Sequence, residues 1–513
     1  MKGICLKSLC ASAPLREFFV FLWLSGMGLH ADVSMPPIFG DHMVLQQGVT
    51  LPVWGLASPD EHVSLSIGNL SEETVADHSG KWRINLRPLP SSSEPLVMVI
   101  NGNNRLELHD VIVGDVWVCA GEANMAFPLS DAPIGKESDE KIADKKLRFF
   151  QYENILELNR AHGTQVGTQS VHRKGRWVVC SLDSAPAFSA VGYFFARDLR
   201  TSHHLPIGMI QCTRKHSPIV SWISQPGLTK PPSISPSTNF GEGNSGQSSC
   251  FEQLINPLIP YAITGIIWYQ GECDEGSAAL QYRRILPRMI RDWRERWGEG
   301  PFPFYFVSQA GFGDEEGSAV ESYHTQYGNP GPGRALPWLR EGSACALSLP
   351  FTGMAQASDL GLADERIPPD KLDVGRRLAL LARHRVYGEE IVDTGPCYRG
   401  MKLERGKDRD NDKVRVDFDS VGGGLVLGVS PSKSEGFSPS PVTSLKGFAL
   451  AGSNRKWFPA QGRIEGETVL LWSDAVPHPV AVRYGWRGFP NGTLYNKEGL
   501  PASPFRTDTD QPE

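Results

Sequence analysis

Residues 121–127, with the sequence GEANMAF, follow an apolar run at 111–120. A strand that ends in a glycine turn is where α/β hydrolytic enzymes present a nucleophile, because the sharp turn exposes one side chain above the edge of the sheet. Here that side chain is the methyl group of Ala123, which can neither attack an ester nor accept a proton. Either other residues supply the chemistry, or the turn has lost it.

Two thiols and one imidazole could replace the missing group. Cys273 lies between Glu272 and Asp274, whose negative charges disfavour the reactive thiolate. Cys119 lies inside an apolar run, where a cysteine is usually inert packing. His216 lies in a polar turn and is either a displaced base or, as is more common for a turn histidine, simply solvated.

The N-terminus has the pattern of a secretory leader. Basic residues precede the apolar run at 18–29, and the small residue Ala31 follows it. We therefore predict a signal peptide at residues 1–31 and a mature protein that is secreted or periplasmic, hence extracytoplasmic, without membrane contact after its removal. An uncleaved membrane anchor is the alternative.

Composition narrows the function further. The 513 residues are 40% hydrophobic and 21% charged, with a net charge of -6, which is typical of a globular protein and argues against binding nucleic acid. The cysteines beyond the leader lack paired metal-ligand spacing, so we expect no metal and no cofactor. Disulfides and buried free thiols both remain open.

The chain divides into three parts by pattern. Short alternating runs broken by Gly, Pro, Asn and Ser predict an N-terminal β-sandwich at residues 32–110. Longer apolar runs alternating with helical patterns predict an α/β domain at 111–394. Alternating runs return in 395–513 and predict a C-terminal β-domain.

The central part has the pattern of a parallel sheet covered by helices on both faces. Helical periodicity is clear at 281–298 and 370–388, whereas 311–343 has none and is predicted to be a long surface loop. A site in such a sheet lies at the carboxyl ends of the strands. The apolar runs expected to form its strands are 112–119, 207–212, 263–269, 304–308 and 353–357.

Several phrases, in order along nearly the whole mature chain, resemble the sialate O-acetylesterase family of carbohydrate esterases. The resemblance implies an SGNH-hydrolase-like, three-layer α/β/α domain with a parallel sheet, flanked by N-terminal and C-terminal β-domains. It also implies O-acetylated glycans or sialic acids as substrates. The phrases are FGDHMVLQQGVTLPVWG, VGDVWVCAGEANMAFPL, FSAVGYFFARDL, GIIWYQGECDE, DVGRRLAL and LYNKEGLPASPFRTD.

The family's catalytic residues do not carry over. In the G-Q-S-N-M turn that the family implies, Ala123 stands at the serine and Glu122 at the glutamine. In the D-I-H-P segment, Ile367 stands at the histidine base. By the same resemblance, Lys215 and His216 replace glycines of a turn that would supply oxyanion donors.

The Q-G-E-S-N turn of the family reads Gln270-Gly271-Glu272-Cys273-Asp274 in this chain. Ala123 and Ile367 are thus vestigial nucleophile and base positions. The residues that the resemblance places around the substrate are Glu122, Asn124, Met125, Gln270, Gly271, Glu272, Asp274 and His216.

Other residues near this site have two interpretations. Aromatic side chains there either stack on sugars or belong to the core, and the carboxylates of the late loop are either remnants of a histidine-orienting group or solvated. His384 falls inside a predicted helix and is more simply a residue of its face. The aromatics are Phe127, Trp222, Trp268 and Tyr269, and the carboxylates are Asp359, Asp364 and Glu365.

Three functions follow from these residues. The first is a catalytically silenced member of the family, a pseudoenzyme that retains a pocket for acetylated glycan. The second is an active carbohydrate O-acetylesterase that uses Cys273 or His216 in a non-standard site. The third is a structural protein or a partner of an active relative.

Overall fold

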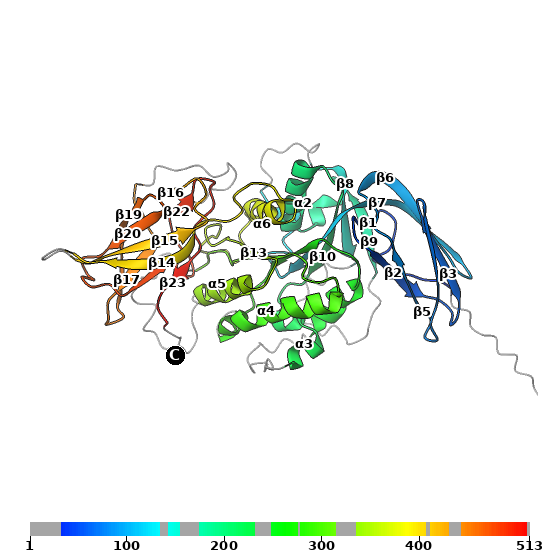
Figure 1. Cartoon of the computed structure of the whole chain (residues 1–513), viewed down its shortest axis with the longest axis horizontal. Coiled ribbons are helices and arrows are strands. Elements are labelled where there is room, and N and C mark those ends of the chain that lie inside the picture. Colours follow the sequence, from blue (N-terminus) through cyan, green and yellow to red (C-terminus); the bar gives the residue numbers. More distant parts are fainter. Residues whose placement is uncertain are drawn as a thin grey trace, which may run out of the picture.

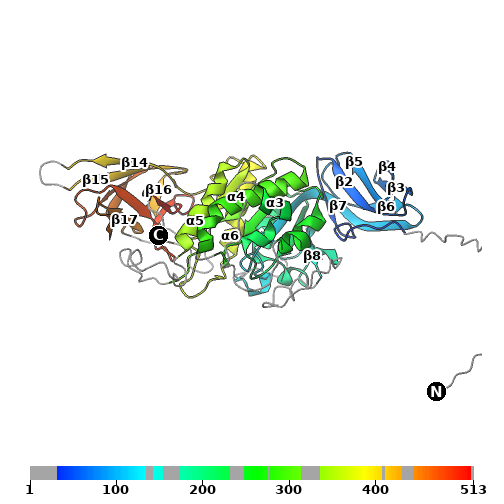
Figure 2. The ribbon, with the colours of Figure 1, turned by 90° about the horizontal axis from the view of Figure 1, so that it is seen from below.

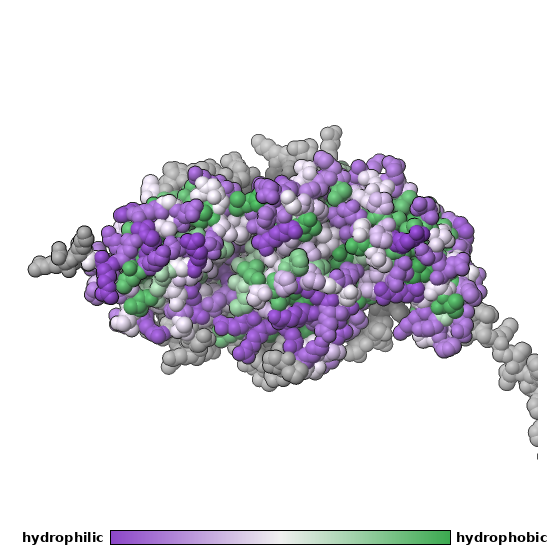
Figure 3. Space-filling model, in the orientation of Figure 1, coloured by the Kyte–Doolittle hydropathy of each residue, from purple (hydrophilic) through white to green (hydrophobic). Residues whose placement is uncertain are grey.

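The computed structural model is elongated, with N-terminal sheets, a central α/β region and C-terminal sheets in a row (Figures 1 and 2). The predicted leader lies outside the described residues. Polar residues cover most of the face in Figure 3, with apolar residues scattered among them. The structure describes residues 32–133, 142–153, 174–230, 248–274, 277–313, 335–406, 411–429 and 443–509.

The N-terminal sheets are built from short strands that alternate between buried and exposed side chains, as in β5, where every second residue is buried. Strands β2 and β5 pair antiparallel, β4, β3, β6 and β7 form a second antiparallel set, and β1 joins β7 in parallel. The strands are β1 (Val44–Gln46), β2 (Leu51–Leu56), β3 (His62–Ile67), β4 (Leu70–Val75), β5 (Lys81–Leu86), β6 (Ser92–Asn101) and β7 (Arg105–Gly121).

Strand β7 belongs to two sheets. Its first part pairs with β6, whereas its last residues, from Asp115 to Gly121, pair with β10 and, from Trp117 onward, with β11 in the central sheet. The domain boundary expected after residue 110 falls inside this one strand, and the three-domain division stays a prediction.

The central sheet has the strand order β13-β12-β11-β7-β10-β8-β9. All of the predicted apolar runs are strands in it and pair in parallel. Sequence reasoning missed β8 and β9, because β8 begins with charged residues and β9 begins with a glycine and an arginine, which leaves only a brief apolar run. The strands that join β7 are β8 (Asp144–Tyr152), β9 (Gly175–Cys180), β10 (Ile207–Thr213), β11 (Gly265–Tyr269), β12 (Phe304–Val307) and β13 (Thr352–Ala355).

Helices cover both faces of this sheet, as the continuous apolar runs indicated. In β7, Trp117 and Cys119 face the cluster that includes α2 and α6, whereas Val116 and Val118 belong to the cluster that includes α4. The helices expected at 281–298 and 370–388 are confirmed as α4 and α6. The helices are α2 (Ala190–His203), α3 (Gln225–Thr229), α4 (Ser277–Trp297), α5 (Leu336–Ala344) and α6 (Leu372–Arg385).

The loop predicted at 311–343 is wrong in its last part. Residues from Leu336 onward form α5, whose buried face includes Arg340 and Ser343 beside its leucines. These polar residues in core positions hide the helical pattern from a hydropathy analysis. Residues 314–334 of the predicted loop lie outside the described part of the chain.

The C-terminal sheets are antiparallel and enclose a separate core that includes Val416, Leu450 and Leu471. One sheet has the order β14-β15-β20-β19, a second β18-β17-β21-β23, and β16 pairs with β22. Among the described residues, no helix is long and apolar enough to cross a membrane. The strands are β14 (Cys397–Glu404), β15 (Lys413–Asp419), β16 (Leu425–Leu427), β17 (Phe448–Ala451), β18 (Trp457–Pro459), β19 (Gln461–Glu465), β20 (Thr468–Trp472), β21 (Ala481–Tyr484), β22 (Leu494–Asn496) and β23 (Phe505–Arg506).

A stack of indole and guanidinium groups fixes the C-terminal sheets to α5. We call it the tryptophan–arginine ladder, and its members are Trp457, Arg483, Trp486, Arg506 and Trp338. The Arg483 guanidinium carbon lies 4.2 Å from the Trp457 ring centroid, and that of Arg506 lies 4.4 Å from the Trp338 centroid. Trp486 lies within 5.7 Å of both arginines. Such contacts are strongest where water is excluded.

Each ladder arginine also has a carboxylate partner. Arg483 Nε donates to Asp508 at 2.6 Å, and Arg506 Nε donates to Glu341 of α5 at 2.7 Å. Arg340, also on α5, donates to the carbonyl oxygens of Arg487 and Gly488 at 2.7 and 2.9 Å. Charge and hydrogen bonding thus hold the C-terminal sheets against the central region.

Candidate functional site

The site lies at the carboxyl ends of β7, β10 and β11, which are neighbours in the central sheet. Gly121 ends β7 at a φ of +144°, and a Cβ there would lie 2.0 Å from the carbonyl oxygen of Tyr269, so only glycine fits. The next residue, Glu122, donates its N–H to the same oxygen at 3.0 Å. The turn that carries Ala123 is therefore fixed against β11.

Asn124 links this turn to the turn after β11. Its backbone N–H and its side-chain Nδ2 both donate to Glu272 Oε1, at 2.7 and 2.5 Å. Ala123 itself is 5% exposed, and Asn124 is fully buried. The two turns that the sequence singled out are thus joined by one carboxylate.

A buried lysine completes this link, and sequence reasoning missed it. Lys371 Nζ donates to Asn124 Oδ1 at 2.6 Å and lies 5.0 Å from the ring centroid of Phe127. Burial lowers the pKa of Lys371 to about 7, although the charge of Glu272 opposes the shift. A lysine just before a helix usually faces water, so nothing in the sequence signalled this contact.

The late loop that carries Ile367 crosses the same site. Arg366 Nη1 donates to the backbone oxygen of Glu272 at 2.8 Å, and Lys371 reaches Asn124 from the other end of the loop. Ile367 lies between Arg366 and Lys371 in the sequence, and its side chain is half-buried. The loop therefore lies beside the two turns, with an aliphatic side chain at the position that the motif assigns to a base.

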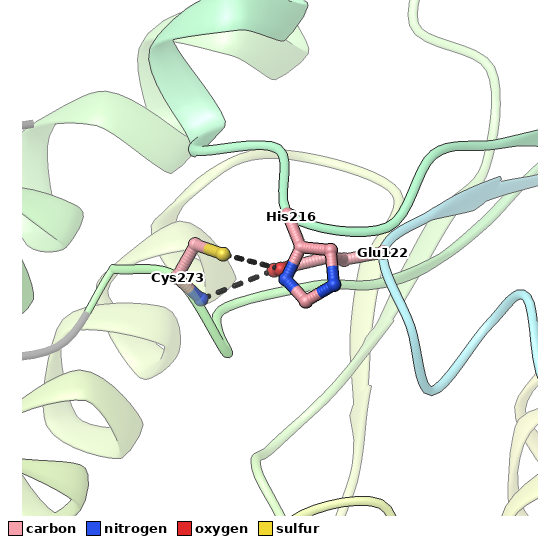
Figure 4. A group of neighbouring side chains, drawn as sticks. All are labelled: Glu122, His216 and Cys273. Atoms are coloured by element: carbon pink, nitrogen blue, oxygen red, sulfur yellow. Dashed lines mark hydrogen bonds between the residues drawn. The ribbon is translucent and has the colours of Figure 1, made fainter. Parts of the chain in front are cut away.

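Cys273 and His216 lie beside the carboxylate of Glu122 (Figure 4). Cys273 donates to Glu122 twice, from Sγ to Oε1 at 2.6 Å and from its backbone N–H to Oε2 at 3.2 Å. Gln270 Nε2 also donates to Glu122 Oε2, at 3.3 Å. One ligand atom each from Glu122, Cys273 and His216 lie within 4.8 Å of one another. The exposed members are His216 and Cys273, while Glu122 is buried.

Three carboxyl groups lie close together here, and we call Glu122, Glu272 and Asp274 the acid cluster. Burial, and then the charge of Glu272, raise the pKa of Glu122 well above its ordinary value. Burial raises the pKa of Asp274 to about 6. Asp274 Oδ2 accepts from the backbone N–H of Ile219 at 2.9 Å, so this carboxylate faces the protein interior and supports the turn.

The thiols of the site are poorly activated. Burial of the sulfur, and then the charge of Glu122, raise the pKa of Cys273. Burial likewise raises the pKa of Cys119, which packs against α2 as an inert strand residue. All the cysteines in the described part of the chain are free. Cys273 is therefore a protonated thiol that donates to Glu122.

Several residues that the sequence assigned either to ligand binding or to the core are core residues in the structure. The Trp222 and Trp268 rings meet edge to face at 5.2 Å between centroids and, like Tyr269, are buried in the core. Met125 is also buried. Asp359 pairs with Arg377, with 2.6 Å from its Oδ1 to Nη1.

His384 is exposed on α6 and, among the described residues, contacts Glu389 rather than the site. Of the aromatic residues that the sequence proposed for sugar stacking, Phe127 is half-buried and lies beside Lys371. Asp364 and Glu365 are exposed in the late loop. Gly271 adopts a φ of +141°, which keeps the turn after β11 tight.

The chain is similar to carbohydrate esterases along most of its length. A family model described as "carbohydrate esterase, sialic acid-specific acetylesterase" matches residues 113–330. The sialate O-acetylesterase of Mus musculus is 25% identical, over 91% of this chain and 92% of that protein. The Homo sapiens protein of the same name is 26% identical, over 90% of each.

A solved structure matches nearly the entire length. The carbohydrate acetylesterase of Xanthomonas citri superposes with a TM-score of 0.77 at 33% identity, covering 93% of this chain and 100% of that one. This match confirms the predicted SGNH-type α/β fold with additional antiparallel sheets. Because a relative at 33% identity covers 93% of this chain and the family model matches its central region, the chain belongs to the sialate O-acetylesterase family of carbohydrate esterases.

Proposed function

We propose that this chain is a catalytically silenced member of its family that retains a pocket for acetylated glycan. The observation that carries the proposal is the methyl group of Ala123 on an intact nucleophile turn, held by Glu122, Asn124 and Glu272. The family's substrates are O-acetylated sialic acid and related carbohydrates, and the proposal assigns this ligand class to the present chain.

The chemistry of ester hydrolysis explains why the site is silent. It requires an oxygen nucleophile, a base that takes its proton and donors for the tetrahedral oxyanion. Ala123 offers no lone pair, and Ile367 offers no proton acceptor. Losing such a unit lowers the rate by about 10^6, with the remainder due to binding and the oxyanion donors.

The proposed glycan binding depends on the exposed edge of the site, formed by His216 and Cys273. Asn124, Gln270 and Glu272 are buried; Asn124 donates to Glu272, and Gln270 donates to Glu122, so these bonds preserve the shape of the turns. The side chains that reach the surface are His216 and Cys273. A glycan bound here would contact this exposed edge and the late loop above it.

Acetate release from O-acetylated sialic acid and from acetylated xylan tests the proposal. The native protein should release none above background, and the double variant Ala123→Ser, Ile367→His should gain measurable release because the turn is already in place. Ala126→Ser is the matched control, since Ala126 lies in the same turn and is also 5% exposed. Clear turnover by the native protein would refute catalytic silence.

Glycan binding needs its own measurement. Calorimetric titration of the native protein with O-acetylated sialic acid should give saturable binding, and the deacetylated sugar should bind more weakly. Equal binding of the two sugars, or none of either, would remove the acetyl-glycan assignment.

A second candidate function is hydrolysis by Cys273, favoured by its closeness to His216 and Glu122. The raised thiol pKa argues against it, because the thiolate is the nucleophile. If the native protein shows turnover, Cys273→Ser should abolish it. Cys345→Ser, which alters an exposed thiol elsewhere, should leave the turnover unchanged.

Secretion is a further part of the proposal. The support is the leader pattern at residues 1–31, with its basic start and its apolar run. Mass spectrometry of the protein from its native host should show an N-terminus near Asp32. A mature chain that still begins at Met1 would contradict cleavage.

A further inference from the structure

Three side chains bring three kinds of metal-ligand atom to one point of the site. A carboxylate oxygen of Glu122, a ring nitrogen of His216 and the sulfur of Cys273 lie within 4.8 Å of one another (Figure 4). The three residues follow β7, β10 and β11, so adjacent strands of the rigid sheet position them. We propose that Glu122, His216 and Cys273 form a binding site for Zn²⁺.

The donor set selects the kind of metal. Thiolate, imidazole and carboxylate are the ligands of zinc in proteins, and three protein ligands leave a fourth position for water or for an oxygen of a bound molecule. Mg²⁺ and Ca²⁺ instead prefer oxygen ligands throughout. A sulfur and a nitrogen out of three donors therefore favour zinc over these hard cations.

Small side-chain movements bring the donors to bonding distance. Bonds of zinc to S, N and O place tetrahedral donor atoms about 3.5 Å apart. Cys273 Sγ lies 2.6 Å from Glu122 Oε1, so these two atoms must separate by about 1 Å to hold a zinc ion between them. His216 is exposed, and Cys273 is an exposed residue whose sulfur is partly buried against the Glu122 carboxylate.

The surroundings orient the carboxylate ligand. Gln270 Nε2 and the Cys273 N–H both donate to Glu122 Oε2, at 3.3 and 3.2 Å. They leave Oε1 facing the sulfur. Supporting hydrogen bonds of this kind hold metal ligands in place and tune their affinity.

Independent evidence for a cation comes from unbalanced buried charge. Within the described residues, Glu272 Oε2 and Asp274 Oδ1 are buried atoms that lack a hydrogen-bond partner. Glu272 is 7% exposed and Asp274 is 0% exposed, and both interact electrostatically with Glu122 and Cys273. The Lys371 ammonium reaches this framework through Asn124, and the Arg366 guanidinium donates to the backbone oxygen of Glu272, so neither bonds to the two unpartnered oxygens. A divalent ion beside the acid cluster would compensate the remaining negative charge.

By the resemblance described above, the three donors also stand at positions where this chain departs from the motifs of its family. Glu122 stands at a glutamine, His216 at a glycine and Cys273 at a serine. Each change converts a poor metal ligand into a good one, and the fold brings all three together. The same chain has lost the nucleophile between them, at Ala123. Metal binding accounts for the three changes with one cause.

The test is a titration of the full chain after metal removal by a chelator. Calorimetry with Zn²⁺ should show saturable binding of one ion per chain. Co²⁺, which occupies zinc sites, should produce the absorption band of thiolate-to-cobalt charge transfer. Both measurements are independent of acetate release, so failure of this site and failure of the proposed function are distinguishable.

Variants assign the ligands. Cys273→Ser and His216→Ala should each weaken Zn²⁺ binding by about tenfold or more, a loss seen even when residues that support a metal site are removed. The cobalt charge-transfer band should vanish in Cys273→Ser. Cys345→Ser, a change to another exposed thiol, should alter neither.

Both ligand variants change exposed side chains, so thermal melting should show a fold like that of the native protein. Absence of saturable Zn²⁺ binding by the native chain would overturn the proposal. Native affinity in Cys273→Ser, or a cobalt spectrum without the thiolate band, would overturn it as well.

Discussion

Two regions of the molecule bury ionisable side chains, the acid cluster at the edge of the central sheet and the tryptophan–arginine ladder between α5 and the C-terminal sheets. In the ladder, Arg483 and Arg506 each have a carboxylate within hydrogen-bonding distance and indole rings beside them. In the acid cluster, carboxyl groups gather beside one lysine, and buried oxygens of Glu272 and Asp274 lack partners in the described structure.

This difference in pairing distinguishes buried charges that stabilise the fold from buried charges that serve a ligand. Paired buried charges fix how two elements meet, and their removal costs stability. Unpaired buried carboxyl groups cost stability in the folded state and shift their own pKa, which is typical of a site that serves a ligand. The measurements below either separate the two regions by these criteria or show that they behave alike.

The largest expected effect is in the ladder. Arg506→Met leaves Glu341 and Asp508 without one of their guanidinium partners and removes the contact with Trp338. We expect a loss of about 3 kcal/mol of unfolding free energy, measured by chemical denaturation. The control is Arg463→Met, where solvent screens the pair with Glu465 and the loss should be much smaller. Equal losses would show that the ladder is no stronger than a surface pair.

A ligand should stabilise the acid cluster instead. Zn²⁺ at about 100 times its dissociation constant should raise the unfolding free energy of the native chain by about 2.7 kcal/mol. The Arg506→Met variant should gain the same amount, because its site is intact. His216→Ala should gain much less. A gain in His216→Ala equal to that of the native chain would place the metal elsewhere.

Lys371 should give the acid cluster a pH dependence that the ladder lacks. The ordinary lysine pKa is 10.5 and that of folded Lys371 is about 7, so between these values the unfolded state holds more protons. The metal-free native protein should therefore gain up to about 1.4 kcal/mol of stability per pH unit as the pH rises from 7 to 9. Glu272, Asp370 and Glu365 are the charges that oppose the shift.

Thermal melting from pH 7 to 9 checks this, with the native protein compared against Lys371→Met. The native protein should gain relative to the variant as pH rises. Lys456→Met, at an exposed lysine, should track the native protein at every pH. If the stability of Lys371→Met changes with pH in the same way as that of the native protein, the surroundings of Lys371 do not lower its pKa.

The smallest effect should come from neutralising one carboxyl of the acid cluster. Glu122→Gln keeps the shape and one acceptor oxygen, and it removes a buried acid whose pKa is raised. We expect the metal-free protein to gain about 1 kcal/mol, and to lose its Zn²⁺ binding. Denaturation with and without the metal measures both. Destabilisation in the absence of metal would show that the carboxylate is structural, as in the ladder.

Much of the fold could be predicted from the sequence, because parallel strands buried on both faces are continuous apolar runs. That pattern located β7, β10, β11, β12 and β13. It missed β8, whose first residues are charged, and it missed α5, whose buried face carries Arg340. Where buried polar residues are stabilised by hydrogen bonds, the hydropathy of the sequence no longer indicates which residues are buried.

The site was predictable only in part. The glycine turns placed Ala123 and Cys273 at strand ends, but which side chains meet there depends on strand order. The expectation of no metal site rested on spacing along the chain, which detects only ligands that are close in sequence. Glu122, His216 and Cys273 lie in turns after three separate strands. Lys371 carried no signal, since its burial depends on the loop path.

The strand β7 has a consequence for how the molecule moves. It spans 17 residues and is hydrogen-bonded to β6 at one end and to β10 and β11 at the other. Domains joined by a linker can swing about it, but a strand shared by two sheets leaves no hinge. The N-terminal sheets and the glycine turn at Gly121 should therefore tumble as one rigid body. A force applied to the N-terminal sheets would be transmitted along the β7 backbone to the site.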